Sequence, residues 1–109
     1  MPRLMVRGIK AGVMSSVSIA LVEELAQICE CDKKAFSIEL LSTTNICNWT
    51  NTEPVPFIEV AWFDRGQEKR DGFARAIASH FASTGVPHVT VAFINYKKDS
   101  YYRDGKAVG

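Results

Sequence analysis

The chain is short, nearly neutral and apolar enough to fold. It has 109 residues, of which 47% are hydrophobic and 23% charged, and its formal net charge is +1. This length and composition are typical of a soluble globular protein, and we expect a single domain over residues 1–109. The near-neutral charge argues against nucleic acid or an anionic membrane as a partner.

The N-terminus offers unusual chemistry because Pro2 follows Met1 directly. If Met1 is removed, Pro2 carries a free secondary amine. An α-amino group titrates near ~7.7–8.0, and burial or a nearby cation would leave it neutral at physiological pH. Such an amine could act as a general base, whereas the plain interpretation is an ordinary start of translation.

The first half of the chain predicts a strand, a helix and a second strand. Residues 2–9 alternate in hydrophobicity, which is typical of a strand. Apolar residues then recur at helical spacing, which predicts a helix capped by Ser15 or Ser16 and ending near Cys29. Polar interruptions argue against a signal peptide here, and no apolar stretch reaches the length of a membrane span.

The middle of the chain predicts a turn, two strands and a long loop. A turn over 32–34 leads into a strand over 35–42, in which Phe36, Ile38 and Leu40 share one side. Residues 43–55 are rich in Thr, Asn and Pro, which indicates a loop. A third strand is expected over 56–63.

The second half repeats the plan with a helix and a final strand. Asp64 and Gln67 resemble a capping box at the helix start, and Gly85 and Pro87 end the helix. Phe73, Ile77 and Phe81 form its apolar stripe, while Gly72 is unfavourable in a helix by roughly 1 kcal/mol. A fourth strand follows over 88–94, and Asp104-Gly105 predicts a short hairpin.

The element order is two β-α-β halves, which predicts an α+β fold. Each crossover helix makes its two strands a parallel pair, and both helices cover one face of a four-stranded mixed sheet. Arg7, Glu39 and Glu59 fall on the second face beside apolar residues. This face either meets another copy of the chain, with Arg–Glu pairs fixing the register, or is exposed with solvated ion pairs.

The cysteines and histidines do not form a metal-binding pattern. Cys29 and Cys31 are two residues apart and Cys47 is distant, so no zinc set is available. We expect reduced thiols in a cytoplasmic protein. His80 and His88 show no partner pattern and are expected to be structural. Nothing in the sequence indicates a metal or an organic cofactor.

Three stretches resemble a small uncharacterised bacterial family within the tautomerase superfamily, which includes macrophage migration inhibitory factor. They are Phe57-Ile-Glu-Val-Ala-Trp-Phe-Asp-Arg-Gly-Gln67, Phe36-Ser-Ile-Glu-Leu-Leu41 and Tyr101-Tyr-Arg-Asp-Gly105. Pro2 at the head of the first strand, the doubled β-α-β plan and the late Phe-Ile-Asn-Tyr stretch extend the resemblance over nearly the whole chain. The resemblance implies a homotrimer with active sites between subunits.

The resemblance also assigns roles to individual residues. It implies that Pro2 is the catalytic general base or acid, that Lys33 and Asn95 contact substrate, and that Phe93 stands where migration inhibitory factor has a tyrosine. The Arg65-Gly66 stretch falls where a backbone amide contributes to the site. Whether Lys33 or Lys34 points into the site stays open.

The helix start at Arg65-Gly66 supports an anion site on physical grounds as well. Free amides at a helix N-terminus favour a carboxylate or a developing enolate, and Arg65 can add a bidentate contact. The plain alternatives are a surface ion pair of Arg65 with Asp64 or Glu68, a solvated Lys33, and a turn hydrogen bond for Asn95. Phe93 and Trp62 can equally be core aromatics.

Three functions fit these observations. The first is a cofactor-independent tautomerase that moves a proton within a small 2-oxo or hydroxy-unsaturated acid, with Pro2 as base. The second is a non-catalytic trimer of the same fold. The third is a ferredoxin-like binding module, which has the same order of elements but a different order of strands in the sheet.

Overall fold

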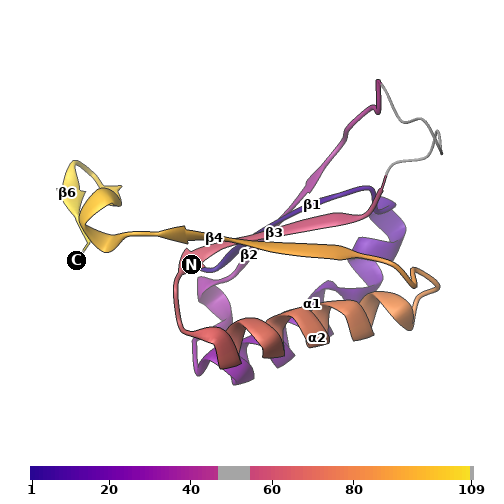
Figure 1. Cartoon of the computed structure of the whole chain (residues 1–109), viewed down its shortest axis with the longest axis horizontal. Helices are drawn as coiled ribbons and strands as arrows, with labels where there is room; N and C mark the ends of the chain where they lie inside the picture. The colour runs from indigo at the N-terminus through magenta and orange to yellow at the C-terminus, as the bar shows by residue number, and fades with distance from the viewer. Residues whose placement is uncertain (47–54, 109) are drawn as a thin grey trace.

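The protein is a two-layer α+β domain with both helices on one face of a sheet (Figure 1). The computed structural model describes residues 1–46 and 55–108. The helices are α1 (Ala11–Cys29) and α2 (Gln67–Ala82), with short 3-10 turns η1 (Lys33–Ala35) and η2 (Lys98–Ser100). The strands are β1 (Arg3–Arg7), β2 (Ser37–Leu41), β3 (Phe57–Phe63), β4 (Thr90–Tyr96), β5 (Tyr102–Arg103) and β6 (Lys106–Ala107).

The sheet order β2-β1-β3-β4 confirms the doubled β-α-β plan. β1 pairs in parallel with β2, β3 pairs in parallel with β4, and β1 and β3 run antiparallel at the centre. The two strands of each half are direct neighbours. A ferredoxin-like sheet instead splits its β-α-β unit with an inserted strand, so the topology excludes that alternative.

The core fills the space between the sheet and the helices. Leu4 and Val6 of the central strand β1 are fully buried, and Trp62, Phe73 and Phe81 are the largest buried side chains. The aromatic rings contact one another across the layers, with centroid distances of 5.1 Å for Trp62–Phe73 and 6.3 Å for Phe36–Phe73. The predicted apolar stripe of α2 therefore packs on the sheet as expected.

Helix α1 begins at Ala11, earlier than the sequence indicated. Lys10 is the N-cap and provides no side-chain hydrogen bond, so the prediction of a cap at Ser15 or Ser16 is wrong. The early start brings Met14 onto the buried stripe. With 19 residues, α1 is long and apolar enough to cross a membrane by length and composition, contrary to expectation. Its buried side chains, among them Met14, Val17 and Leu21, belong to the core.

Gly72, unfavourable for helix propensity, is explained by packing between the helices. A Cβ at this position would lie 3.1 Å from Cγ2 of Ile28 on α1. Glycine therefore lets the two helices approach closely. Lys69 also joins the helices, because its ammonium group donates a hydrogen bond of 2.6 Å to the Ile28 carbonyl near the end of α1.

The Arg–Glu pairs on the second sheet face form within the chain. Arg7 Nη2 lies 2.6 Å from Glu59 Oε1, and Arg3 lies 3.8 Å from Glu39. Each glutamate thus has an arginine of its own chain on the neighbouring strand, and the contact of this face with another copy stays a prediction. The helices leave this face uncovered (Figure 1).

The C-terminal segment extends beyond the sheet and ends in the predicted hairpin (Figure 1). Asp104 and Gly105 form its turn with φ values of 53° and 80°. Tyr101 anchors the segment, because its ring contacts Phe63 and Tyr96 at centroid distances of 5.1 and 5.6 Å. Tyr102 remains largely exposed.

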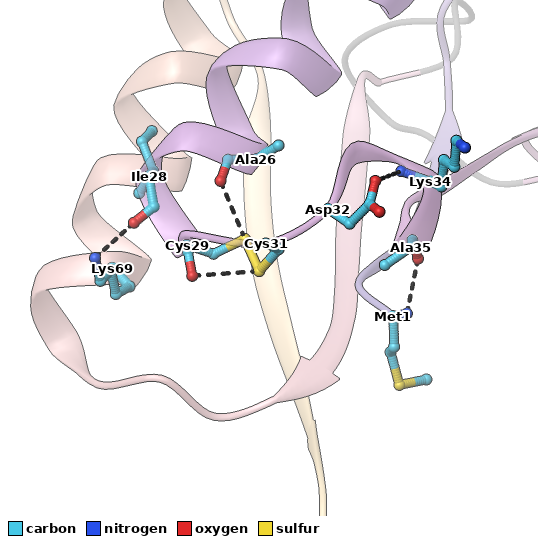
Figure 2. The surroundings of a disulfide bond; sticks show 9 residues. All are labelled: Met1, Ala26, Ile28, Cys29, Cys31, Asp32, Lys34, Ala35 and Lys69. Carbon is cyan, nitrogen blue, oxygen red and sulfur yellow. Dashed lines mark hydrogen bonds between the residues drawn. A yellow bond between two sulfur atoms is a disulfide. The ribbon is translucent and has the colours of Figure 1, made fainter.

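Cys29 and Cys31 are joined by a disulfide (Figure 2). The expectation of reduced thiols is therefore wrong for this pair. Two residues of separation place the sulfurs close because Glu30 adopts a left-handed conformation, φ 56°, at the end of α1. Cys47 lies outside the described residues.

Replacing Gly8 should destabilise the fold strongly. Gly8 follows β1 with φ 79°, and a Cβ there would overlap the Val55–Pro56 backbone, 2.8 Å from the Pro56 nitrogen. We expect Gly8→Ala to lower the free energy of unfolding by about 2–3 kcal/mol in urea denaturation.

Gly12 provides the matched control, because a Cβ there meets no atom within 4 Å. Gly12→Ala should raise the free energy of unfolding by about 0.5–1 kcal/mol, as expected for alanine in a helix. Equal effects of the two substitutions would contradict the assigned close approach at Gly8.

Candidate functional site

The N-terminus is held against the sheet by its backbone. Figure 2 shows the Met1 amino group donating a hydrogen bond of 2.7 Å to the Ala35 carbonyl. The Pro2 side chain is fully buried, and the Pro2 carbonyl accepts a bond of 3.3 Å from the Ser37 amide at the start of β2. The position proposed for the base is therefore fixed by packing and by the β1–β2 pairing.

Three arginines act on this terminus from different parts of the chain. The pKa of the Met1 amino group is lowered below its ordinary value by desolvation first, and then by the charges of Arg103, Arg65 and Arg3. The structure therefore brings the predicted residue Arg65 into the electrostatic surroundings of the N-terminus. Arg103 is exposed on the C-terminal segment, and its charge still acts on this terminus.

The start of α2 differs from the predicted capping box. Gly66, with φ 94°, is the N-cap, and Asp64 Oδ1 accepts its amide at 3.1 Å. Asp64 also forms an ion pair with Arg70, which leaves Arg65 without an ion pair among the described residues. The Gly66 amide, then Arg70 and the Arg65 amide, lower the pKa of Asp64, with desolvation opposing them. The Gly66 amide therefore already donates its hydrogen bond to Asp64 and is not a free donor for an anion.

Asn95 and Phe93 lie on the helix-facing side of β4, in contact with Trp62. Asn95 Oδ1 accepts a hydrogen bond of 2.8 Å from the indole Nε1 of Trp62, and the Phe93 ring lies 4.9 Å from the Trp62 ring. Trp62 pairs with Asn95 across β3 and β4. Continuing the β1–β3 register beyond Arg3 and Ala61 places Pro2 opposite Trp62.

Lys33 and Lys34 lie beside a different hollow of the molecule. Both line an apolar cavity of about 410 Å³ between α1 and β2, together with Ile19, Val22 and Ile38. Lys33 alone of the two also lines a second cavity of about 440 Å³. Among the described residues, neither cavity is lined by Pro2, Arg65, Phe93 or Asn95, so one chain does not gather all the predicted contacts in one pocket.

No metal-binding cluster of His, Cys, Asp or Glu occurs in the described part of the chain. His80 has a structural contact instead, since its Nε2 lies 2.8 Å from Glu24 on α1. The sequence pointed to Pro2, Arg65 and Asn95. It missed the Ala35 carbonyl, because a backbone acceptor carries no residue-specific signal.

The Asn95–Trp62 hydrogen bond provides a test of the site's architecture. Asn95→Ala should lower the free energy of unfolding by about 1 kcal/mol, because it leaves the indole N–H of a buried ring without its acceptor. Asn95→Asp keeps an acceptor oxygen and should retain most of the stability. Urea unfolding of the two variants checks this, and equal losses would contradict the role assigned to Oδ1.

The chain matches the family described as Domain of unknown function (DUF1904) over residues 1–107. No functionally curated protein matches it by sequence. The crystal structure of a DUF1904 domain from Sebaldella termitidis is 33% identical with a TM-score of 0.84, covering 96% of this chain and 97% of that one.

More distant solved structures share the fold. A macrophage migration inhibitory factor homologue from Prochlorococcus marinus is 18% identical with a TM-score of 0.78, covering 99% of this chain and 100% of that one. Pt0534 inactivated by 2-oxo-3-pentynoate is 15% identical with a TM-score of 0.75, covering 97% and 94%. An asymmetric trimer of fused 4-OT is 17% identical with a TM-score of 0.78, covering 98% and 96%. The chain thus belongs to the DUF1904 family, whose fold is that of the tautomerase superfamily.

Proposed function

We propose that this chain, once Met1 has been removed, is a cofactor-independent tautomerase that acts on a small 2-oxo or hydroxy-unsaturated acid. One observation carries the proposal. Partial burial and then the charges of Arg103, Arg65 and Arg3 lower the pKa of the Met1 amino group below its ordinary value. A neutral amine beside cationic groups is suited to take a proton from a carbon acid that carries a carboxylate.

Removal of Met1 would make the Pro2 nitrogen the terminal amine. The Pro2 side chain is fully buried while Met1 is in place, so the new terminal amine would lie against the packed part of the chain, where burial lowers the pKa of an amine. Pro2 would take a proton from the carbon next to the substrate carbonyl, leaving an enolate. Returning that proton at the other end of the conjugated system completes a 1,3-shift.

Arg65 is the group we assign to the anionic part of the substrate. Its guanidinium has no ion pair among the described residues, and its charge already acts on the N-terminus. Gly66 contributes only its turn, with φ 94°, because its amide already donates a hydrogen bond to Asp64 and is not free for substrate. The inactivation of Pt0534 by 2-oxo-3-pentynoate, itself a 2-oxo acid, supports the proposed substrate class.

Self-association would complete the site. Lys33, Phe93 and Asn95 are kept as proposed substrate contacts, and copies packed side by side could bring such residues to a neighbour's Pro2. The sheet face without helices carries Met5 and Phe57 beside arginines whose Nε atoms are buried without a hydrogen-bond partner in the described structure. The fused 4-OT trimer supports a trimeric arrangement.

We also propose a cytoplasmic location.

A second candidate function is that of a non-catalytic member of this fold. The hydrogen bond from the Met1 amine to Ala35 favours it, because a chain that keeps Met1 has an amide at Pro2 and a terminus already tied to the backbone. Intact mass of the protein from its own host separates the two candidates.

Ketonisation of phenylpyruvate or 2-hydroxymuconate tests the proposed activity. The Met1-free protein should accelerate the reaction, and a chain that retains Met1 should be slower by about 10²–10⁴-fold, the usual contribution of a general base. Pro2→Ala should also lower the rate. Equal rates for the three proteins would contradict the role of Pro2.

The pH profile of kcat/KM is a second readout of the same base. Activity needs the neutral amine, so it should rise with pH through the amine's pKa. Arg65→Gln removes a charge that lowers this pKa, and the profile should shift to higher pH. Arg75→Gln makes the same charge change on the exposed side of α2 and should leave the profile in place.

Light scattering tests the proposed trimer. At micromolar concentration the molar mass should be three times the 12.1 kDa of the chain. A monomer under these conditions would contradict a site completed by neighbouring copies.

A further inference from the structure

We propose that Cys29 and Cys31 form a reversible thiol–disulfide exchange site at the end of α1, independent of the N-terminal amine. External thiols such as glutathione would attack the Cys31 sulfur, and Cys29 would be the buried leaving group. Figure 2 shows the pair where the helix passes into the turn that precedes η1.

The disulfide contributes little to holding the fold together. The stabilisation that a cross-link gives grows with the logarithm of the length of the loop that it closes, and these cysteines are only two residues apart. The end of α1 is also secured without it. The Glu30 amide donates to the Ala26 and Gln27 carbonyls, and the Cys31 amide donates to Ala26 at 3.0 Å. Because the fold does not depend on this disulfide, the bond can break and re-form in the folded protein.

The two sulfurs differ in access. Cys29 is 7% exposed and belongs to the hydrophobic core, whereas Cys31 is half-buried and packs at its edge. Cys31 also lines the cavity of about 440 Å³ that Lys33 lines, together with Glu23, Ala26 and Gln27. An incoming thiolate therefore reaches the sulfur of Cys31 first.

The surroundings accommodate the reduced pair as well as the oxidised one. The Cys29 sulfur lies 3.8 Å from the Ala26 carbonyl oxygen, and the Cys31 sulfur lies 3.3 Å from the Cys29 carbonyl oxygen (Figure 2). A disulfide sulfur carries no proton, so these carbonyl oxygens become hydrogen-bond acceptors only when reduction supplies the thiol protons. Neither state requires a new polar partner, which favours reversible exchange.

Nearby charges favour the approach of an anionic thiol. Lys33 lines the cavity beside Cys31, and the Lys69 ammonium group sits at the Ile28 carbonyl, next to Cys29. Glu23 lines the same cavity and opposes them in part. Lys34 is the useful contrast, because its side chain points away from the disulfide in Figure 2 and does not line that cavity.

The exchange balances in two steps. A glutathione thiolate attacks the Cys31 sulfur, an S–S bond to glutathione forms, and the Cys29–Cys31 bond breaks to leave a Cys29 thiolate, which takes up a proton. A second glutathione thiolate then attacks the glutathione sulfur. This releases glutathione disulfide and the Cys31 thiolate, so two electrons pass from two glutathione molecules to the protein. The reverse sequence oxidises the pair. In a cytoplasmic protein, disulfides are typically transient in this way.

Redox titration of the full chain tests reversibility. Cys47→Ser is used throughout to remove the third thiol. Across graded mixtures of reduced and oxidised glutathione, intact mass should show the pair passing between dithiol and disulfide while circular dichroism stays native. A pair that stays reduced in oxidised glutathione overturns the proposal, as does a disulfide that resists excess dithiothreitol in the folded protein.

Single-cysteine variants identify the attacked sulfur. In the Cys47→Ser background, Cys29→Ser leaves Cys31 alone and should form a mixed disulfide with oxidised glutathione. Cys31→Ser leaves the buried Cys29, which should react at about one tenth of that rate or more slowly still. Equal rates, or faster reaction at Cys29, would overturn the assignment.

Lys33 and Lys34 provide a matched pair for the electrostatic part. At low salt, Lys33→Gln should slow reduction by glutathione about fivefold, which corresponds to a surface charge interaction of about 1 kcal/mol. Lys34→Gln should stay within about twofold of the parent. Equal slowing in both variants would contradict a specific role for Lys33.

Discussion

The rest of the structure depends on β1 lying at the centre of the sheet. Its parallel pairing with β2 and antiparallel pairing with β3 join the two β-α-β halves into one sheet, and Leu4 and Val6 bury its helix-facing side completely. Because the strand begins directly after Pro2, the same pairing fixes the N-terminus. A chain end is normally mobile, and here its second residue is fully buried and hydrogen-bonded.

This position explains why the terminus has altered electrostatics. The start of β1 lies beside the end of β3, and the β3–α2 connection that follows carries Arg65. The C-terminal segment adds the charge of Arg103 at the same terminus. Burial and three positive charges all disfavour an ammonium ion. An ordinary terminus in solvent would have neither effect, so the arrangement is the physical basis for the proposed base.

The order of strands and helices along the chain was predicted well because the periodicity of apolar side chains can be read directly from the sequence. The four strands, both crossover helices and the turn at Asp104-Gly105 are confirmed, and so is the assignment of Arg7, Glu39 and Glu59 to the second face. Helix starts were predicted less well. Lys10 and Gly66 are N-caps without a side-chain hydrogen bond, so the sequence does not mark them as helix starts. The caps were predicted instead at Ser15 or Ser16 and at Asp64, whose side chains are typical of N-caps.

The candidate site was predictable only residue by residue. Pro2 and Asn95 stand out in the sequence, yet their common row with Trp62 depends on strand register, which periodicity does not give. The pairing of Cys29 with Cys31 depends on one left-handed residue, Glu30, whose conformation the sequence does not indicate. The Arg–Glu pairs also needed the register, because β1 brings each arginine beside a glutamate of its own chain.

The exchange site lies close in sequence to Ala35, whose carbonyl binds the N-terminal amine, but separate hydrogen bonds hold the two in place. The chain from Cys31 to Ala35 links the disulfide to the carbonyl that binds the Met1 amine. Between them, η1 has its own cap, since the Asp32 side chain accepts the Lys34 amide at 2.9 Å and the Asp32 carbonyl accepts the Ala35 amide at 2.9 Å. These bonds hold Ala35 in place whether or not the sulfurs are joined. Reduction of the pair should therefore leave both the end of α1 and the acceptor at the N-terminus in place, so exchange at the sulfurs need not disturb the N-terminal amine.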